Sequence, residues 1–429
     1  MKDNHARDNG IITLKVADII FREDLYPRIE TSPTTVQTYA ENLEVLPPVE
    51  INQWNELIDG WHRWTAHKKA GVAEINAVVT STQSDIALLE LAIERNAIHG
   101  LQLSQPDKRD MARRIYNSTP ERERTNKKTH LATILSVPDR TIREWLSRID
   151  KDTKAARDKR IFDLWLACYT QEEIGQMVGV SHQEVSRTLH ESAELPNGAK
   201  PAAEHMADFS PPIYNVWKWQ TKSSGASHYG NSEPQIVDNL LYLYTKPFDV
   251  VVDPFAGGGS TVDVCRKRFR RYFVSDRKPI VERERDIRQW DIVNGPPPLS
   301  RWENVRLVYL DPPYWKQAEH AYSTDTDDFA NMPLDTFTDT LAKTITGIGK
   351  KLPSGAVVAL LLQPTQWRAP DHAYTDHVAD MLRMVKYPLD MRIQCPYESQ
   401  QANAQMVEWA KAQRRVLVLS RELVIWRIP

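Results

Sequence analysis

Residues 307–316, LVYLDPPYWK, combine side-chain types that could handle a ligand. A run of β-forming residues ends on an acid, Asp311, and two prolines and two aromatic residues follow at once. The prolines fix the backbone, while Tyr314 and Trp315 add flat rings beside a hydrogen-bond acceptor. An ordinary loop needs neither feature, so the pattern predicts a ligand-binding corner at the end of a buried strand.

A second stretch, VVVDPFAGGGSTVDVC at residues 250–265, has the order expected of a cofactor-binding turn. An apolar strand runs into Asp253, and Gly257–Gly259 precede a predicted helix. Glycines let the backbone approach a ligand, and a helix N-terminus offers unpaired N–H groups. The next strand ends on Asp276, an acid suited to a ribose diol, and Asp291 could accept from an adenine amine. No Gly-Lys-Ser/Thr follows the glycines, so this is not a phosphate-binding P-loop.

Taken together, DPFAGGGST and DPPY resemble motifs I and IV of the S-adenosylmethionine-dependent DNA methyltransferases that modify exocyclic amines. Residues 230–255 and 420–428 also resemble the segment before motif I and the last strand of that family. The similarity covers residues 211–429 and implies a Rossmann-like sheet. The cofactor-binding residues it implies are Asp253, Pro254, Phe255, Gly257 and Gly259 at the methionine end, Asp276 at the ribose and Asp291 at the adenine.

The resemblance gives each residue of DPPY a catalytic role. An exocyclic amine is a poor nucleophile because its lone pair is delocalised into the ring. The Asp311 carboxylate and the Pro312 carbonyl would accept its N–H protons and stabilise the developing positive charge. Pro313 helps to fix this backbone, and Tyr314 would stack on a base taken out of the duplex, with Trp315 assisting.

Several details bear on the substrate. Aspartate rather than serine at the head of DPPY favours adenine N6 over cytosine N4. A carbon-methylating enzyme would need a cysteine after a proline, whereas Cys395 precedes Pro396. Asp276 is a mild departure, because the family often has glutamate there. Residues 316–333 are polar and form either a lid over the base or a surface loop, with Tyr322 as the residue to test first.

Two helix–turn–helix patterns precede the predicted sheet. In YTQEEIGQMVGVSHQEVSRTLHE, residues 169–191, Thr170 and Glu173 form a predicted capping box and Gly179 makes the turn. A similar pattern occupies residues 130–149. Such hairpins also serve as protein interfaces, but in tandem they favour DNA binding. The expected DNA contacts are Arg140, Thr141 and Arg143 in the upstream pattern and His182, Gln183, Ser186 and Arg187 in the downstream one.

The N-terminal stretch LIDGWHRWTAHKKAG, residues 57–71, resembles the Gly-x-x-Arg box of ParB-like domains. That resemblance implies nucleotide phosphates near Gly60 and Arg63. However, Trp61 and His62 stand where the family most often has Glu and Arg. A structural corner in a DNA-associated accessory domain is therefore the alternative to nucleotide binding.

These patterns divide the 429 residues into four regions. We expect a small α+β ParB-like domain at 1–100, an all-helical DNA-binding region at 101–192 and a linker rich in Pro and Ala at 193–210. Residues 211–429 alternate strands and helices, which indicates an α/β methyltransferase sheet. Its last two apolar runs, RRVLVLS and LVIWRIP, are predicted to form a C-terminal β-hairpin.

Composition narrows the class of protein. The net charge is −2, yet residues 101–160 hold 16 Lys and Arg against 9 Asp and Glu, which suits a phosphate backbone. Cys168, Cys265 and Cys395 lack paired spacing, so we expect neither a disulfide framework nor a metal site. No apolar run is long enough to span a bilayer. We therefore expect a cytoplasmic, nucleoid-associated protein without a membrane partner.

The sequence thus predicts an S-adenosylmethionine-dependent DNA (adenine-N6) methyltransferase that acts on double-stranded DNA. An N4-cytosine or RNA substrate is one alternative, and a non-catalytic ParB-like DNA-binding or partition regulator is another. The domain combination suggests a restriction-modification system or a phage. The recognition sequence, a partner nuclease and the oligomeric state, a homodimer included, stay open.

Overall fold

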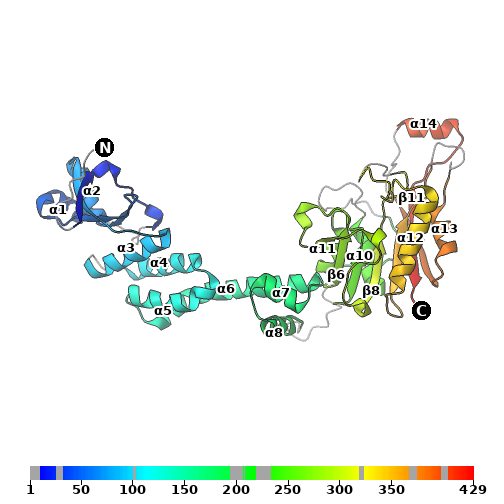
Figure 1. Ribbon diagram of the computed structural model, residues 1–429, viewed down its shortest axis with the longest axis horizontal. Helices are drawn as coiled ribbons and strands as arrows, with labels where there is room; N and C mark the ends of the chain where they lie inside the picture. Colours follow the sequence, from blue (N-terminus) through cyan, green and yellow to red (C-terminus); the bar gives the residue numbers. More distant parts are fainter. Residues whose placement is uncertain are drawn as a thin grey trace. The chain divides into compact units, whose positions relative to one another are not determined.

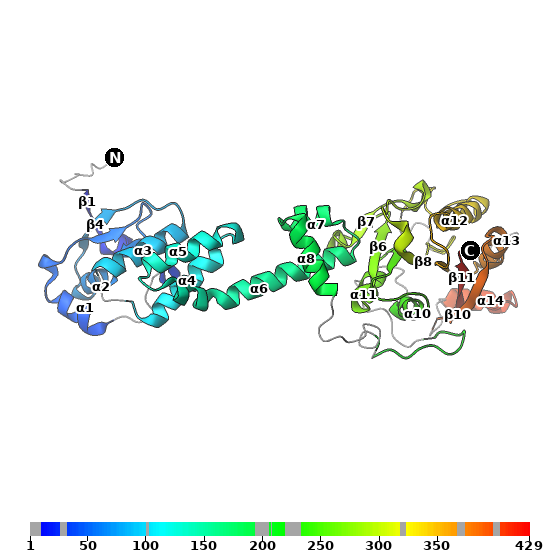
Figure 2. The ribbon, with the colours of Figure 1, turned by 90° about the horizontal axis from the view of Figure 1, so that it is seen from below.

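The computed structural model describes residues 10–25, 32–99, 103–193, 206, 208–218, 233–317, 323–366, 374–397 and 404–429. The chain divides into two compact units, Met1–Ala156 and Arg157–Pro429 (Figures 1 and 2). This division falls inside the helical region expected at 101–192, whose first helices belong to the first unit and whose last helices belong to the second. Most of the expected linker, 193–210, lies outside the described residues.

The first unit contains a four-stranded sheet in the order β1-β4-β2-β3. Strand β4 pairs antiparallel with β1 and parallel with β2, and β2 pairs antiparallel with β3. The strands are β1 (Ile11–Lys15), β2 (Val49–Ile51), β3 (Leu57–Asp59) and β4 (Glu74–Val79). The helices are α1 (Pro33–Ala40), α2 (Trp61–Ala70), α3 (Asp85–His99), α4 (Gln105–Ser118), α5 (Arg124–Ile134) and the first part of α6 (Asp139–Leu166).

The second unit is built on a seven-stranded sheet in the order β10-β11-β9-β8-β5-β6-β7. Strands β9, β8, β5, β6 and β7 run parallel, while β11 pairs antiparallel with both β9 and β10. The strands are β5 (Val250–Asp253), β6 (Arg271–Asp276), β7 (Ile287–Gln289), β8 (Val305–Leu310), β9 (Val357–Leu362), β10 (Leu389–Pro396) and β11 (Ser420–Arg427). The mixed α/β class expected for this region is confirmed.

Helices cover both faces of this sheet. Figure 2 shows α10 and α11 on one face and α12 and α13 on the other. Side chains alternate between the faces along each strand, so Val250 and Val252 join the core under α12 while Val251 joins the core under α10. The helices of this unit are α7 (Gln171–Val178), α8 (His182–Ala193), α10 (Pro234–Tyr244), α11 (Ser260–Lys267), α12 (Leu334–Gly349), α13 (His377–Met384) and α14 (Ala404–Ala412).

The predicted C-terminal hairpin is wrong in its first strand. The partner of β11 is β10, Leu389–Pro396, rather than the RRVLVLS run at 414–420. Val416 is 86% exposed, so the apolar side chains of that run have no core to cover. The run therefore stays outside regular structure until Ser420, and α14 separates the two paired strands.

Within the described ranges, no helix combines the length and apolar character needed to cross a bilayer. Cys168, Cys265 and Cys395 are free thiols. The same ranges contain no cluster of three or more His, Cys, Asp or Glu side chains with metal-binding geometry.

Candidate active site

Three neighbouring parallel strands bring acidic residues to one edge of the second sheet. Asp253 is the last residue of β5 and Asp276 the last of β6, while Asp311 directly follows β8. The order β8-β5-β6 makes these strands adjacent. Because the carboxyl ends of parallel strands lie at the same edge, the three acids meet on one side of the sheet, where open α/β sheets bind ligands.

The buried carboxyl group of Asp253, 2% exposed, holds the glycine-rich turn. Its Oδ1 accepts from the Phe255 backbone N–H at 2.9 Å, and its Oδ2 accepts from the Thr261 hydroxyl at 2.6 Å. Gly257 and Gly259 have φ angles of +48° and +86°, in the left-handed region that favours glycine. The predicted turn geometry is thus confirmed, and these bonds link the end of β5 to the start of α11.

Burial raises the pKa of Asp253 to about 7. The hydrogen bonds from Thr261 and Phe255 oppose this rise, and the negative charges of Asp311 and Asp276 add to it. The three carboxyl groups are therefore close enough to interact. This edge has a negative potential that suits a cationic ligand.

Asp276 and Asp291, which the sequence assigns to a ribose and an adenine, already hold protein groups. Asp276 Oδ2 accepts from the Gly257 backbone N–H at 3.0 Å. Asp291 Oδ1 accepts from the Val293 N–H at 3.1 Å, and its Oδ2 lies 3.3 Å from Nε of Arg277. A carboxylate offers about four acceptor positions, so each retains capacity for a ligand hydroxyl or amine.

Arg277 is a residue that sequence reasoning missed. Its Nη2 lies 3.0 Å from Oδ2 of Asp325 and 2.9 Å from Oδ1 of Asp327, while its Nε faces Asp291. It therefore ties the loop after β8 to the expected adenine end of the site. No periodic pattern reveals such a link, because its partners come from two segments, one at Asp291 and one at Asp325 and Asp327.

Two tyrosine hydroxyls orient the half-buried carboxylate of Asp311. Tyr309 donates to Oδ2 at 3.3 Å and Tyr314 donates to Oδ1 at 3.1 Å. Burial raises the pKa of Tyr314 well above its ordinary value, and the charge of Asp311 adds to this, so the phenol keeps its proton. Pro312 is buried and Pro313 is half-buried. Tyr309 was not predicted, although its place two residues before Asp311 on a strand was the available signal.

Trp315 does not assist in stacking a base. Its indole is 4% exposed, and Nε1 donates to the Met332 carbonyl at 2.8 Å. Its own carbonyl accepts from the Thr365 hydroxyl at 2.9 Å, and that hydroxyl lies 2.9 Å from Nε2 of His377. Burial lowers the pKa of His377 to about 4. The expectation for Trp315 was wrong because its ring fills the core beneath the loop.

The loop interpreted as either a lid or a surface loop, 316–333, is anchored in its described part. Phe329 is 4% exposed and belongs to the core, and Asn331 Nδ2 donates to the Ser323 carbonyl at 2.9 Å. Tyr322 lies outside the described residues. A moving segment is therefore not supported for 323–333.

A buried arginine from the last strand was also missed. Arg421 is 3% exposed, and its Nη2 lies 2.6 Å from Oε2 of Glu233. Its guanidinium lies 4.3 Å from the ring centroid of Tyr397, whose hydroxyl donates to Gln363 Oε1 at 2.9 Å. No local pattern marks it, because Arg421 lies between Ser420 and Glu422 at the start of β11.

The downstream helix–turn–helix has the predicted local structure. Thr170 and Glu173 form a capping box around α7, and Gly179 ends that helix with a φ of +79°. Ile174, Val185 and Leu189 pack in the shared core of α7 and α8. The four residues expected to contact DNA are exposed on α8, namely His182, Gln183, Ser186 and Arg187.

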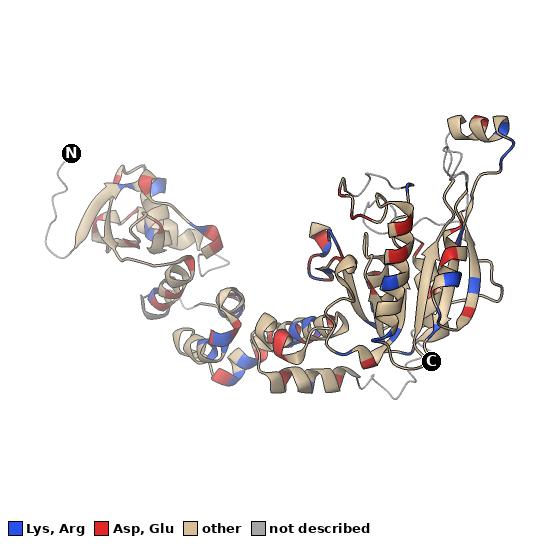
Figure 3. Cartoon of the chain, turned by 45° about the vertical axis from the view of Figure 1, so that its right-hand side comes forward, with Lys and Arg blue, Asp and Glu red and all other residues tan. Residues whose placement is uncertain are grey.

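The upstream pattern forms the turn between α5 and α6. Arg140 and Arg143 are exposed, and Thr141 is half-buried. Arg143 pairs with Asp139. Figure 3 shows basic and acidic residues mixed along these helices. Other cations there are paired as well, such as Lys128 with Asp150 at 2.6 Å, so ion pairs offset part of the positive charge of 101–160.

The Gly-x-x-Arg motif, residues 60–63, forms a tightly packed turn at the start of α2. Gly60 has a φ of +101° at the start of α2, and a Cβ there would lie 2.9 Å from the Arg63 side chain. Arg63 Nη2 lies 2.8 Å from Asp59 Oδ2, and Nη1 donates to the Pro48 carbonyl at 3.0 Å. These contacts agree with the structural alternative, and nucleotide binding stays a prediction.

Comparison with known proteins agrees with this site. A DNA methylase family matches residues 104–281. The match contains the glycine-rich turn and Asp276, and it ends before Asp311. The chain is 31% identical over 65 residues to the type II methyltransferase M.XycI of Xanthomonas campestris pv. cyanopsidis, covering 15% of this chain and 22% of that protein. A similar stretch of 64 residues is 31% identical to M.Cfr9I of Citrobacter freundii, over 15% of this chain and 21% of the relative. The chain thus spans only about a fifth of the length of these curated relatives.

Solved structures give weaker matches. TrmN from Thermus thermophilus aligns with 45% of this chain and 48% of its own, at 16% identity and a TM-score of 0.29. A truncated ParB from Caulobacter crescentus in complex with CTP-gamma-S aligns with 44% of this chain and 81% of its own, at 18% identity and a TM-score of 0.19. These scores are too low to support a functional argument, so the ParB-like assignment stays a prediction.

Proposed function

We propose that this protein is a DNA methyltransferase that transfers a methyl group from S-adenosylmethionine to the exocyclic amine of a base in double-stranded DNA. The observation that carries the proposal is the setting of Asp311. Its carboxylate, oriented by two tyrosine hydroxyls, stands at the same sheet edge as a glycine-rich turn. The family match to residues 104–281 supports the same reaction class.

The residues of the carboxyl edge fit this cofactor. Its sulfonium is a cation, and the edge carries the carboxyl groups of Asp253 and Asp276, which the sequence assigns to the cofactor. Asp276 and Asp291 would hold its hydroxyl and amine groups, while Phe255 offers a half-buried ring beside the turn. Pro254 is buried and helps to fix the turn. When bound, the cofactor supplies an electrophilic methyl group.

The protein's part in the reaction is placement and electrostatics. Asp311 accepts a hydrogen bond from the target amine, which directs the nitrogen lone pair away from the ring. The amine nitrogen would take the methyl group of the bound cofactor, which would leave as the neutral thioether. The Asp311 carboxylate would stabilise the positive charge on nitrogen until its extra proton passes to solvent. Tyr309 and Tyr314 keep the acceptor oxygens aimed, which lowers the cost of reorganisation.

Adenine N6 is the proposed target, because aspartate rather than serine heads the motif at 311–314. Helices α7 and α8, and the α5–α6 pair, are proposed to bind the duplex through their exposed polar residues. The non-catalytic alternative is a DNA-binding regulator in which the second unit serves only as a scaffold. It predicts DNA binding without methyl transfer.

Replacing Asp311 tests the proposal. Asp311→Ala should reduce methyl transfer from labelled cofactor to mixed-sequence duplex by at least about 10³-fold, because it removes charge stabilisation at the reacting nitrogen. Cofactor binding, measured by calorimetry, should stay within about threefold of the wild type, a difference of less than 1 kcal/mol. Asp339→Ala is the matched control, since Asp339 is an exposed acid on α12 with only a 3.8 Å pair to Lys343. Wild-type rates in Asp311→Ala would refute the role of Asp311.

A further inference from the structure

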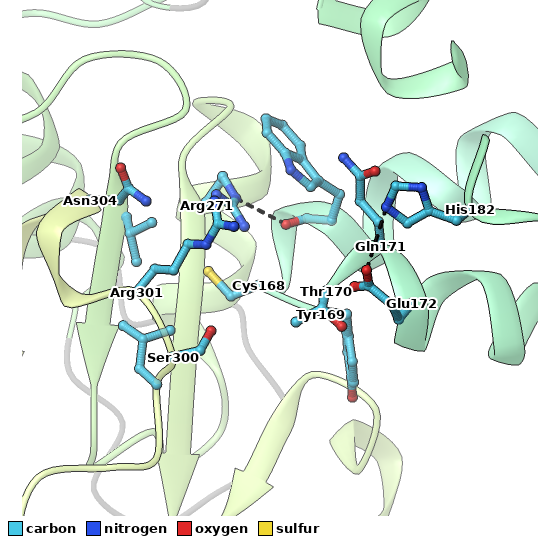
Figure 4. A pocket seen from close by; sticks show the side chains of 13 residues that line it. Cys168, Tyr169, Thr170, Gln171, Glu172, His182, Arg271, Ser300, Arg301 and Asn304 are labelled. Carbon is cyan, nitrogen blue, oxygen red and sulfur yellow. Dashed lines mark hydrogen bonds and ion pairs between the residues drawn. The ribbon is translucent and has the colours of Figure 1, made fainter. Parts of the chain in front are cut away.

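The second unit contains a cavity of about 290 Å³, and Figure 4 shows side chains that line it. Its floor includes Val250 and Arg271, the first residues of β5 and β6, and Asn304, which directly precedes β8. Its opposite wall comes from the residues around α7 and the start of α8. The cavity therefore lies at the amino ends of the strands whose carboxyl ends hold Asp253, Asp276 and Asp311.

Two stacked arginines hold the helical wall against the sheet. Arg271 Nε donates to the Trp165 carbonyl at 3.2 Å, and its guanidinium lies 4.6 Å from the Trp165 ring centroid. Arg288 Nη2 donates to the Ala167 carbonyl at 3.0 Å, and the guanidinium carbon of Arg288 lies 4.5 Å from the Tyr169 ring centroid. These contacts fix α7 and α8 on this edge, so the cavity is part of the fold.

The lining carries more donor capacity than the protein uses. In the part of the chain that the structure describes, the guanidinium of Arg301 and the Nη groups of Arg271 have no hydrogen-bond partner. Ser300 and Asn304 add neutral polar groups on the same side. The carboxylate of Glu172 is the opposing charge, and it lies 3.5 Å from His182. Two guanidinium groups beside hydroxyl and amide donors match the charge and geometry of a phosphate.

The position of α8 beside the cavity indicates which kind of phosphate could bind there, namely a phosphate of a DNA backbone. His182 lines the cavity and is also the first residue of α8, whose exposed side chains include Gln183, Ser186 and Arg187. In helix–turn–helix proteins, the N-terminal residues of the second helix enter the major groove, and phosphates of the flanking backbone lie close by. A duplex that met α8 in this way would bring a backbone phosphate to the mouth of the cavity.

We propose that this cavity, defined by Arg271, Ser300, Arg301, Asn304, Gln171 and His182, binds a backbone phosphate of duplex DNA whose major groove takes α8. The proposal rests on the proposed function only in taking DNA as the partner. It places sequence readout at the edge opposite the base pocket. The six residues of β6 span about 20 Å, so readout lies on the order of six base pairs from the methylated base, or on a second duplex.

Arg301 allows a clean test, because its side chain is exposed and forms no ion pair within the described part of the chain. Duplex binding by the full-length protein is measured by fluorescence anisotropy over a salt series in Arg301→Ala, Arg301→Lys and Lys343→Ala. Arg301→Ala should weaken binding about tenfold and reduce the slope of log K against log salt by about 0.9, the value for one lost phosphate contact. Arg301→Lys should restore most of the slope. Lys343 is 81% exposed on α12, so Lys343→Ala removes one positive charge away from the cavity and should match the wild type.

Other outcomes overturn the proposal. An unchanged slope in Arg301→Ala, with an unchanged melting temperature, would rule out a DNA phosphate in the cavity. Titrating inorganic phosphate into the wild type and into Arg301→Ala distinguishes the two possible ligands, a DNA backbone phosphate and a free anion. A loss of phosphate binding without a change in DNA binding would assign the cavity to a free anion instead. The Asp311→Ala result is independent, so failure here leaves the proposed methyl transfer intact.

Discussion

The two edges of the seven-stranded sheet differ in charge and in what surrounds them. The carboxyl edge gathers Asp253, Asp276 and Asp311. The amino edge carries Arg271, and the helix–turn–helix packs against it. In a parallel sheet, all strands present the same end to the same side, so one edge can specialise in chemistry and the other in docking. Under the proposed function, this difference would place methyl transfer at one end of the strands and DNA recognition at the other.

The largest predicted change is a pH-dependent loss of stability that arises from Asp253 at the carboxyl edge. The pKa of Asp253 is about 7 in the folded chain and about 3.9 when unfolded, so the folded state holds an extra proton between these values. The free energy of unfolding should therefore decrease as pH rises from about 4 to 7, by up to about 4 kcal/mol from this group, and then level off. Asp253→Asn should remove this contribution. Denaturant unfolding of both proteins at several pH values measures it.

The comparison with Asp253→Asn is needed because His377 changes the pH dependence of stability in the opposite direction. Its pKa of about 4 lies below the unfolded value, so its contribution to stability is lost as pH falls below about 6.5. Both proteins retain His377, and its effect cancels in the difference between them. Parallel pH profiles for the wild type and Asp253→Asn would show that Asp253 is not buried with its proton.

Thr261→Val should reduce stability by an intermediate amount. The exchange keeps the shape of a side chain that is 2% exposed but removes the 2.6 Å hydrogen bond to Asp253. Stability should fall by about 1–3 kcal/mol at pH 8, where the carboxylate is charged, and by less at pH 5. Thr338→Val is the control, since that hydroxyl bonds only the Leu334 carbonyl of its own helix. Equal losses at both pH values would contradict the link between Thr261 and the charge of Asp253.

The smallest change in stability is expected for a substitution at the amino edge. Tyr169→Phe removes the 3.1 Å hydrogen bond to the Arg285 carbonyl and keeps the ring that Arg288 stacks on. Because the ring contact remains, stability should fall by about 1 kcal/mol or less, and the salt dependence of DNA binding should not change. Thermal unfolding and the anisotropy assay measure the two quantities. A loss of DNA binding would show that the hydroxyl, rather than the stacked rings, positions the helix–turn–helix.

Sequence reasoning succeeded where the information is local. Thr170, Glu173 and Gly179 set the ends of α7, and the buried parallel strands appear as continuous apolar runs that end on Asp253 and Asp276. The glycine-rich turn between strand and helix was also predicted from local sequence, although the left-handed φ angles of Gly257 and Gly259 were not.

Features that depend on tertiary contacts were missed or wrong. Strand β10 is an edge strand whose first residues are exposed, so it lacks an apolar run, whereas the apolar RRVLVLS segment finds no core. The sequence suggested that Trp315 could stack on a base, but its side chain is buried in the core. The amino-edge cavity joins segments more than a hundred residues apart, from Gln171 to Arg301, and no local pattern encodes that meeting.

The central claim is that the carboxyl edge methylates an exocyclic amine of DNA. The most direct measurement incubates the full-length protein with labelled S-adenosylmethionine and mixed-sequence duplex, digests the product and identifies the labelled nucleoside by mass spectrometry. The account predicts N6-methyldeoxyadenosine, and N4-methyldeoxycytidine would keep the reaction class but correct the base. Label on a ring carbon, or DNA binding with no labelled nucleoside, would contradict it.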